Sequence, residues 1–152
     1  MQDNLARMVF REVIRPPLWV LAFIYFLFLS LVIAIWAALD NRSALISWIA
    51  ATLGIIAIAI RWRTEITVDD KELRIGGAHI ELRYLKEVSA LSAQEMRLMR
   101  TRDADPAAFL ALAFWIPAGV KIVLNDDRDS VPYWLISVRK SEELTRTLYR
   151  LI

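Results

Sequence analysis

The residue types that carry catalysis and metal binding are scarce in this chain of 152 residues. It has no cysteine and one histidine, which excludes thiolate nucleophiles, disulfides, iron–sulfur clusters and most zinc sites. The histidine, His79, lies two residues before Glu81 on one predicted strand face, where the two side chains could share a proton. No nucleophile or metal-binding residue accompanies them in the sequence, so an exposed strand histidine is the simpler interpretation.

Three aspartates resemble a fragment of a calcium-binding loop: Asp126, Asp127 and Asp129. The glycine expected at the sixth position counted from Asn125 is absent, and Ile136 stands where the bidentate acid belongs. We therefore expect a solvated hairpin turn and no bound metal. Because a Gly-x-Ser-x-Gly motif, a glycine-rich phosphate loop and paired carboxylates in apolar surroundings are also missing, we expect no cofactor and no enzyme activity.

One candidate interaction site is the aromatic cluster Phe114, Trp115 and Ile116. It lies inside a stretch without charge, residues 107–120, which is too short to span a membrane and is interrupted by Pro117. Beside a turn, these side chains could enter the membrane interface or dock a partner. The alternative is that the stretch forms a strand pair within a core.

A second candidate combines Asp105 with Tyr133 and Trp134, an acid and two amphipathic aromatics that could line a pocket. The alternative is a structural role, because tryptophan and tyrosine in small β-domains commonly fill core space. In the alternating run that begins at Tyr133, Trp134 shares an apolar face with the residues two and four positions further on. We therefore expect Trp134 beneath a C-terminal helix, near Leu144 or Leu148, and Tyr133 nearer the rim.

Two long runs without charge, residues 18–39 and 44–60, hold much of the 57% hydrophobic content. As a helix the first run is about 33 Å long and can cross a hydrocarbon core of about 30 Å, whereas the second is about 25 Å long. A signal peptide is excluded because its apolar region should be only about 7 to 15 residues long. Tryptophans near the predicted ends support both spans. The two runs predict a transmembrane helical hairpin.

The arginines predict the orientation of the hairpin. Three arginines precede the first span and two follow the second, against one in the link, so the positive-inside rule predicts that both termini face the cytoplasm. Residues 64–152 hold 13 basic and 14 acidic side chains and lack the positive footprint of a nucleic-acid-binding domain. We expect a multi-pass protein of the inner (plasma) membrane that binds no nucleic acid.

The second run carries small residues at helical spacing, in the pairs Ala50/Gly54 and Ser47/Ala51. Such faces allow helices to approach closely. The simplest occupant of this face is the first span of the same chain. The sharper alternatives are a homodimer or the helix of a partner protein.

From residue 64 onward the hydrophobic period changes from helical to alternating. Seven short strands are expected, with a helix capped by Ser92 and Glu95 between the fourth and fifth and an amphipathic helix from Ser141 at the end. This order is that of a pleckstrin-homology-like barrel closed by a C-terminal helix, although other hairpin-rich α+β folds share it. The expected organisation is an N-terminal segment with the hairpin, 1–63, and an α+β, mainly β cytoplasmic domain, 64–152.

Two strings are distinctive when taken together: Asp105-Pro106-Ala107-Ala108-Phe109 and Pro132-Tyr133-Trp134-Leu135. They occur with Leu73-Arg74-Ile75-Gly76, with a strand from Val120 to Leu124 before an acidic turn, and with Arg15-Pro16-Pro17-Leu18-Trp19 ahead of the hairpin. In this order they resemble an actinobacterial family of two-span membrane proteins, domain of unknown function 3093, over nearly the whole chain. The resemblance implies a membrane location and a cytoplasmic domain similar to bacterial pleckstrin-homology-like modules, and it supplies no reaction.

The function expected from these observations is that of a non-enzymatic, membrane-anchored interaction or scaffold module, which recruits or steadies another protein at the inner membrane face. Two alternatives stay open. One is a lipid-headgroup-sensing module, since the domain is tethered beside anionic lipid. The other is an accessory subunit of a membrane enzyme or transporter, which should carry an ionisable residue within a span, and neither run has one.

Overall fold

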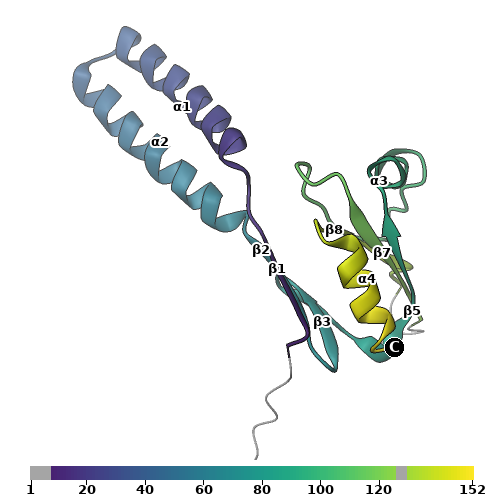
Figure 1. Ribbon diagram of the computed structural model, residues 1–152. Helices are drawn as coiled ribbons and strands as arrows, with labels where there is room; N and C mark the ends of the chain where they lie inside the picture. Colours follow the sequence, from purple (N-terminus) through teal and green to yellow (C-terminus); the bar gives the residue numbers. More distant parts are fainter. Residues whose placement is uncertain (1–7, 126–129) are drawn as a thin grey trace, which may run out of the picture. The chain divides into compact units, whose positions relative to one another are not determined.

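The computed structural model describes residues 8–125 and 130–152 (Figure 1). They form two compact units: residues 15–64 make one, and residues 65–152 together with the N-terminal residues up to Ile14 make the other. The acidic turn that contains Asp126, Asp127 and Asp129 lies outside the described residues.

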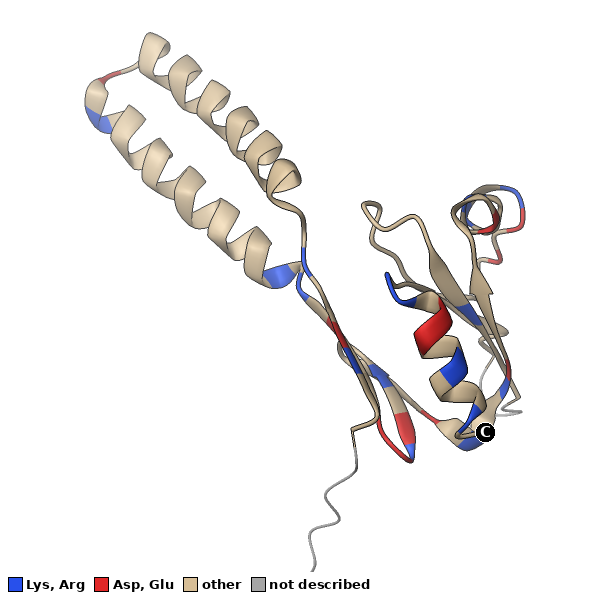
Figure 2. Cartoon of the chain, viewed as in Figure 1, with Lys and Arg blue, Asp and Glu red and all other residues tan. Residues whose placement is uncertain are grey.

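The first unit is a pair of helices, α1 (Leu18–Ala38) and α2 (Asn41–Arg61), on which the two predicted apolar runs fall. Each helix has 21 residues and is long and apolar enough to cross a membrane. In Figure 2 both helices are tan along their length, with charge only at the link and at the far end of α2. Asp40 caps α2 by accepting a hydrogen bond from the Ser43 amide at 3.2 Å.

The second unit contains a strand, β1, that the sequence pattern does not predict. It lies at the edge of a four-stranded sheet with the order β1-β2-β3-β4. The helical hairpin is therefore inserted between two neighbouring strands, and residues 8–14 belong to the β unit rather than to the N-terminal segment expected over 1–63. The strands are β1 (Phe10–Ile14), β2 (Thr64–Val68), β3 (Glu72–Ile75) and β4 (Ala78–Glu81).

Two contacts hold the first strand against the sheet. The Val9 amide donates to the Val68 carbonyl at 2.8 Å, and the Arg11 guanidinium pairs with Glu65 at 2.6 Å. Because both side chains of this ion pair are substantially exposed, the backbone pairing and the burial of Phe10 and Ile14 contribute more to stability.

A second four-stranded sheet has the order β5-β7-β8-β6. β7 pairs antiparallel with β5 and β8, whereas β6 runs parallel to β8 and forms an edge. A 3-10 turn, η1, leads from β4 into this sheet, and the helix α3 lies between β5 and β6 in the sequence. The elements are η1 (Leu82–Tyr84), β5 (Leu85–Leu91), α3 (Ala93–Thr101), β6 (Phe109–Ala111), β7 (Gly119–Leu124) and β8 (Tyr133–Ser137).

One hydrophobic core joins residues of both sheets with the last helix, α4 (Ser141–Tyr149). Leu144 and Leu148 of α4 are fully buried in it. Trp134 belongs to the same core, with its ring centroid 4.5 Å from that of Phe109. The alternation along its strand predicted this placement of Trp134.

The two sheets are not closed into the expected pleckstrin-homology-like barrel. The chain passes from β4 to β5 through η1 and changes sheet, and β6 lies at the edge of the second sheet, parallel to β8. The sheets therefore keep separate edges. A β-rich unit followed by a C-terminal helix is present as predicted, and the described residues contain eight strands in place of the expected seven.

β8 is buried on both faces because α3 covers the side opposite the main core. Met96 of α3 packs there against Tyr133 and Leu135. Tyr133 is 7% exposed and Trp134 is 6% exposed, so the prediction that Tyr133 lies nearer the rim is wrong. Alternation along a strand indicates which side chains share a face, but not that a helix covers the second face.

The first turn of α4 is tied to β1. The helix has no side-chain cap of its own, and the carboxylate of Glu12 accepts hydrogen bonds from the amides of Arg139 and Lys140 at 3.0 and 3.3 Å. An acceptor here satisfies amides near the helix start, and its negative charge suits the positive end of the helix dipole. Residues 127 positions apart are thereby joined.

Two glycines are expected to respond very differently to an added methyl group. A Cβ on Gly119 would lie 2.4 Å from the Ile136 carbonyl oxygen and 2.6 Å from the terminal methyl of Met96. Gly119→Ala must therefore displace backbone or α3, at a cost of about 1 to 3 kcal/mol in unfolding free energy. The thermal midpoint of the full chain in detergent measures this loss.

Gly77→Ala is the matched control, because nothing lies within 4 Å of its Cβ position. Equal thermal midpoints for the two variants would contradict the close approach of α3 and β8 to the start of β7.

Candidate functional site

The neighbours of His79 form surface ion pairs rather than a catalytic group. His79 is exposed and lies opposite Arg74, whose guanidinium is paired with Glu72, and Glu81 is paired with Arg83 at 2.9 Å. Both nearby carboxylates are thus engaged by arginines. In the described part of the chain, no group of three or more His, Cys, Asp or Glu side chains is placed to hold a metal ion.

The structure brings Asp105 and Tyr133 together but separates Trp134 from them. The Tyr133 hydroxyl accepts a hydrogen bond from the Asp105 amide at 3.2 Å and donates to the Asp103 carbonyl at 3.5 Å. The Asp105 carboxylate accepts from the Ala107 amide at 2.9 Å, as in an Asx turn. Trp134 belongs to the core on the other face of the sheet. These contacts stabilise the loop between α3 and β6, and Trp134 lies apart from the other two side chains.

The aromatic cluster at 114–116 is divided between core and surface. Ile116 is 2% exposed and Trp115 packs against the main core, whereas Phe114 is 62% exposed. The ring of Phe114 meets the ring of Trp115 edge-on, with centroids 4.8 Å apart. Of the three candidates, Phe114 is the side chain that is available to a membrane or a partner.

Two further exposed side chains extend this surface along β6. From Phe109 to Phe114 exposed side chains alternate with more buried ones, which leaves Leu110 52% and Leu112 40% exposed. We call Leu110, Leu112 and Phe114 the apolar rim. The two leucines were missing from the sequence-based candidates, although alternation within a stretch that lacks charge was the signal that could have revealed them.

The apolar rim begins on an unprotected sheet edge, because Leu110 belongs to β6. β6 has β8 as its strand partner on one side and no strand on the other within the described residues. Soluble proteins usually protect such edges with charged side chains, prolines or a covering segment. No charged residue occurs between Ala107 and Val120. An edge of this composition is expected to be covered by lipid or by another chain.

An arginine without a carboxylate partner lies next to the loop that carries Phe114. Nη2 of Arg100 donates to the Ser137 hydroxyl at 2.7 Å and to the Ile116 carbonyl at 3.3 Å, and its buried Nε has no hydrogen-bond partner. Burial lowers the pKa of the Arg100 guanidinium. None of the ion pairs within the described residues involves Arg100. The sequence alone assigns Arg100 no role in a site, because its neighbours come from tertiary packing.

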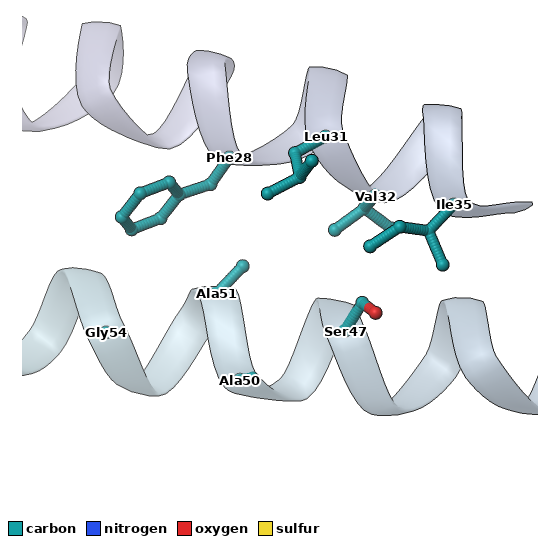
Figure 3. A pocket seen from close by; sticks show the side chains of 8 residues that line it. All are labelled: Phe28, Leu31, Val32, Ile35, Ser47, Ala50, Ala51 and Gly54. Carbon is teal, nitrogen blue, oxygen red and sulfur yellow. The ribbon is translucent and has the colours of Figure 1, made fainter.

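The two helices of the hairpin border a groove of about 290 Å³ (Figure 3). A Cβ on Gly54 would lie 3.4 Å from the ring of Phe28. The small face of α2 therefore lies against α1 of the same chain, which is the simplest of the expected occupants. The groove is lined by Phe28, Leu31, Val32 and Ile35 of α1 and by Ser47, Ala50, Ala51 and Gly54 of α2.

Polar side chains also link the two helices. Nε1 of Trp48 donates to the Tyr25 hydroxyl at 3.1 Å, and that hydroxyl lies 3.3 Å from the hydroxyl of Thr52. Hydrogen bonds between side chains of this kind hold helices together in apolar surroundings. The pairing of α1 with α2 thus depends on contacts within one chain.

The helix that carries Arg100 is expected to loosen in acid. Glu95 accepts from the amide and hydroxyl of Ser92 at 2.8 and 2.7 Å, and these bonds lower its pKa below the ordinary value of 4.5. A depressed carboxylate pKa stabilises the folded form above the unfolded value and ceases to do so as pH falls through the folded value. Amide exchange at the start of α3, corrected for its intrinsic pH dependence, should therefore accelerate below about pH 4.5.

Glu95→Gln is the control, because an amide side chain has no proton to gain in this range. Protection of the α3 amides that falls equally in Glu95→Gln would show that another group is responsible.

Comparison with known sequences gives one family, described as "Protein of unknown function (DUF3093)", which matches residues 9–148. No curated protein and no solved structure matches the chain. The match begins just ahead of β1 and ends at the last buried leucine of α4, so it includes the hairpin and both sheets. The chain therefore belongs to the DUF3093 family.

Proposed function

We propose that this protein is an integral membrane protein that holds a β-rich interaction module at the cytoplasmic face of the inner (plasma) membrane and has no catalytic activity of its own. The observation that carries the proposal is the place of the hairpin in the fold. α1 and α2 are each long and apolar enough to cross a membrane, and they interrupt the chain between two neighbouring strands of one sheet.

The connections to the hairpin are very short. Three residues join the end of β1 to the start of α1, and two residues join the end of α2 to the start of β2. Three residues span at most about 10 Å. If the helices cross a bilayer, the end of the sheet that carries Ile14 and Thr64 lies at its surface.

The charges at the open end of the hairpin support the orientation. Arg15 precedes α1, Arg61 is the last residue of α2, and Arg63 follows it. At the other end of the hairpin, Arg42 lies in the first turn of α2 beside Asp40. A helical hairpin with an excess of arginine at one end usually inserts with that end toward the cytoplasm. The β unit is connected to the arginine-rich end of the hairpin, so it would lie on the cytoplasmic side.

The order of the elements supports a pleckstrin-homology-like origin for the β unit, although its sheets stay open. When α3 and β6 are set aside, seven strands in two sheets precede one C-terminal helix. α3 and β6 form an excursion between β5 and β7, which pair directly. Loops and edges held by a rigid scaffold commonly carry binding residues.

Labelling of a single cysteine tests the topology. The chain has no cysteine, so Asn41→Cys introduces one thiol at the start of α2, next to the link between the helices. We expect a membrane-impermeant maleimide to label it in intact cells, because the link faces outward. Lys71→Cys, in the turn between β2 and β3, is the matched control and should react only after lysis. The reverse pattern would contradict the orientation.

Copurification tests the interaction module. The full chain, tagged and cross-linked in native membranes, should retain a stoichiometric protein partner in mild detergent. The same tag on an unrelated two-helix membrane protein measures background. Recovery of the chain alone at every detergent strength and after cross-linking would count against a scaffold role.

A further inference from the structure

We propose that the apolar rim and Arg100 form a second membrane contact, at which Phe114 enters the interface of the bilayer and Arg100 faces the phosphates of anionic lipids. This inference rests on the proposed function, because it needs the hairpin to lie in the same membrane. The occupant proposed for the rim is the lipid surface itself.

Hydrogen bonds place the loop that carries Phe114 toward one end of the β unit. The Val138 amide donates to the carbonyl of Ala118 at 3.3 Å, so the end of the β6–β7 loop lies beside the residue that follows β8. The next two amides, those of Arg139 and Lys140, donate to Glu12. Glu12 lies two residues before the end of β1, where the chain leaves for α1.

The other end of the second sheet lies at the opposite end of the unit. The Leu82 amide donates to the Lys71 carbonyl at 2.9 Å, and the Asn125 amide donates to the Tyr84 carbonyl at 2.8 Å. These bonds place the start of β5 and the end of β7 beside the turn between β2 and β3, away from Ile14. The rim therefore runs from Leu110, midway along the edge strand of the second sheet, toward the end of the β unit at which β1 leads into α1. Phe114 is the rim residue nearest that end.

The composition of the rim fits an interface of lipid and water. Its three side chains are apolar, exposed and spaced two residues apart, with Leu110 on the edge strand β6 and Leu112 and Phe114 in the uncharged segment that follows it. Phenylalanine and leucine are among the side chains that peripheral segments bury at the boundary between headgroups and acyl chains. A hairpin anchored in a bilayer would tether the β unit through connections of two and three residues, and such a tether raises the effective concentration of lipid at the rim.

Arg100 supplies the polar part of the contact. Its guanidinium is fixed by the Ile116 carbonyl and the Ser137 hydroxyl, and Ile116 is two residues from Phe114. It has no carboxylate partner within the described residues. A half-buried cation without a counter-charge in the described residues favours an external anion, and Nη1 is the guanidinium nitrogen that these hydrogen bonds leave for a phosphate oxygen.

Environment-sensitive fluorophores on single cysteines test the proposal in the full chain reconstituted into vesicles. Phe114→Cys reports on the rim and Lys71→Cys, at the opposite end of the unit, is the matched control. In vesicles of phosphatidylcholine and phosphatidylglycerol, we expect a blue-shifted probe at 114 that nitroxide lipids quench several-fold more strongly than the probe at 71. Equal quenching at the two positions would overturn the contact.

A third position separates this proposal from the proposed function. Leu31→Cys lies within α1 and should be quenched by nitroxides deep in the acyl chains. Quenching at 31 without quenching at 114 would overturn the second contact and leave the membrane anchor standing. Absence of quenching at 31 would overturn both. A probe at 114 that is shielded in native membranes but exposed in vesicles free of other protein would mean that a protein covers the rim, and would also overturn the lipid contact.

Arg100 is tested by the dependence on anionic lipid. With Phe114→Cys as reporter, Arg100→Gln should abolish the increase in quenching that phosphatidylglycerol produces, and Arg100→Lys should restore part of it. Arg102→Gln is the matched control, because Arg102 is an exposed arginine two residues further along the chain. It should leave the phosphatidylglycerol-dependent increase in quenching unchanged. The thermal midpoint of each variant shows whether the fold survives, and a folded Arg100→Gln chain with an unchanged response would remove Arg100 from the contact.

Discussion

β1 and β2 are neighbours in one sheet, yet the whole helical hairpin lies between them in the chain. A flexible insertion of that length would make their pairing entropically costly. The hairpin removes much of this cost, because two helices of equal length joined by a short link return the chain to its starting point. Closure of the sheet and pairing of the helices are therefore linked: a fault in the contacts between α1 and α2 would also separate the two strands.

The segment between β5 and β7, which contains α3 and β6, covers one face of the second sheet and leaves apolar side chains exposed at its edge. α3 covers the second face of the sheet and makes β8 a strand buried on both sides. The chain must then return to the start of β7, and it does so along the edge of the sheet as β6. An edge strand has a neighbouring strand on one side only, so its own sheet covers a side chain there less completely. The exposed apolar rim therefore results from the path of the chain along the sheet edge between α3 and β7.

Periodicity and local chemistry predicted the elements whose signals lie within one segment. The two apolar runs gave the helices, the Ser92 and Glu95 pair gave the start of α3, and alternation gave Trp134 its place in the core. β1 was missed because Phe10–Ile14 is short, carries Arg11 and Glu12, and finds its partner beyond the hairpin. The open sheets, the burial of Tyr133 and the surroundings of Arg100 were missed for a related reason. Each depends on which distant segment arrives at a given face, and a single sequence carries no local signal for that.

The bond between Glu12 and the start of α4 has a consequence for the order of events during synthesis. Glu12 is made ahead of the hairpin, and the first of its partner amides follows 127 residues later, which corresponds to about 6 to 25 s at ordinary elongation rates of about 5 to 20 residues per second. By the end of that interval both helices of the hairpin have long been made, while the first strand still lacks this contact. The ribosome therefore delivers the anchor before the module can close, and the segment that ties β1 to the start of α4 emerges after both helices.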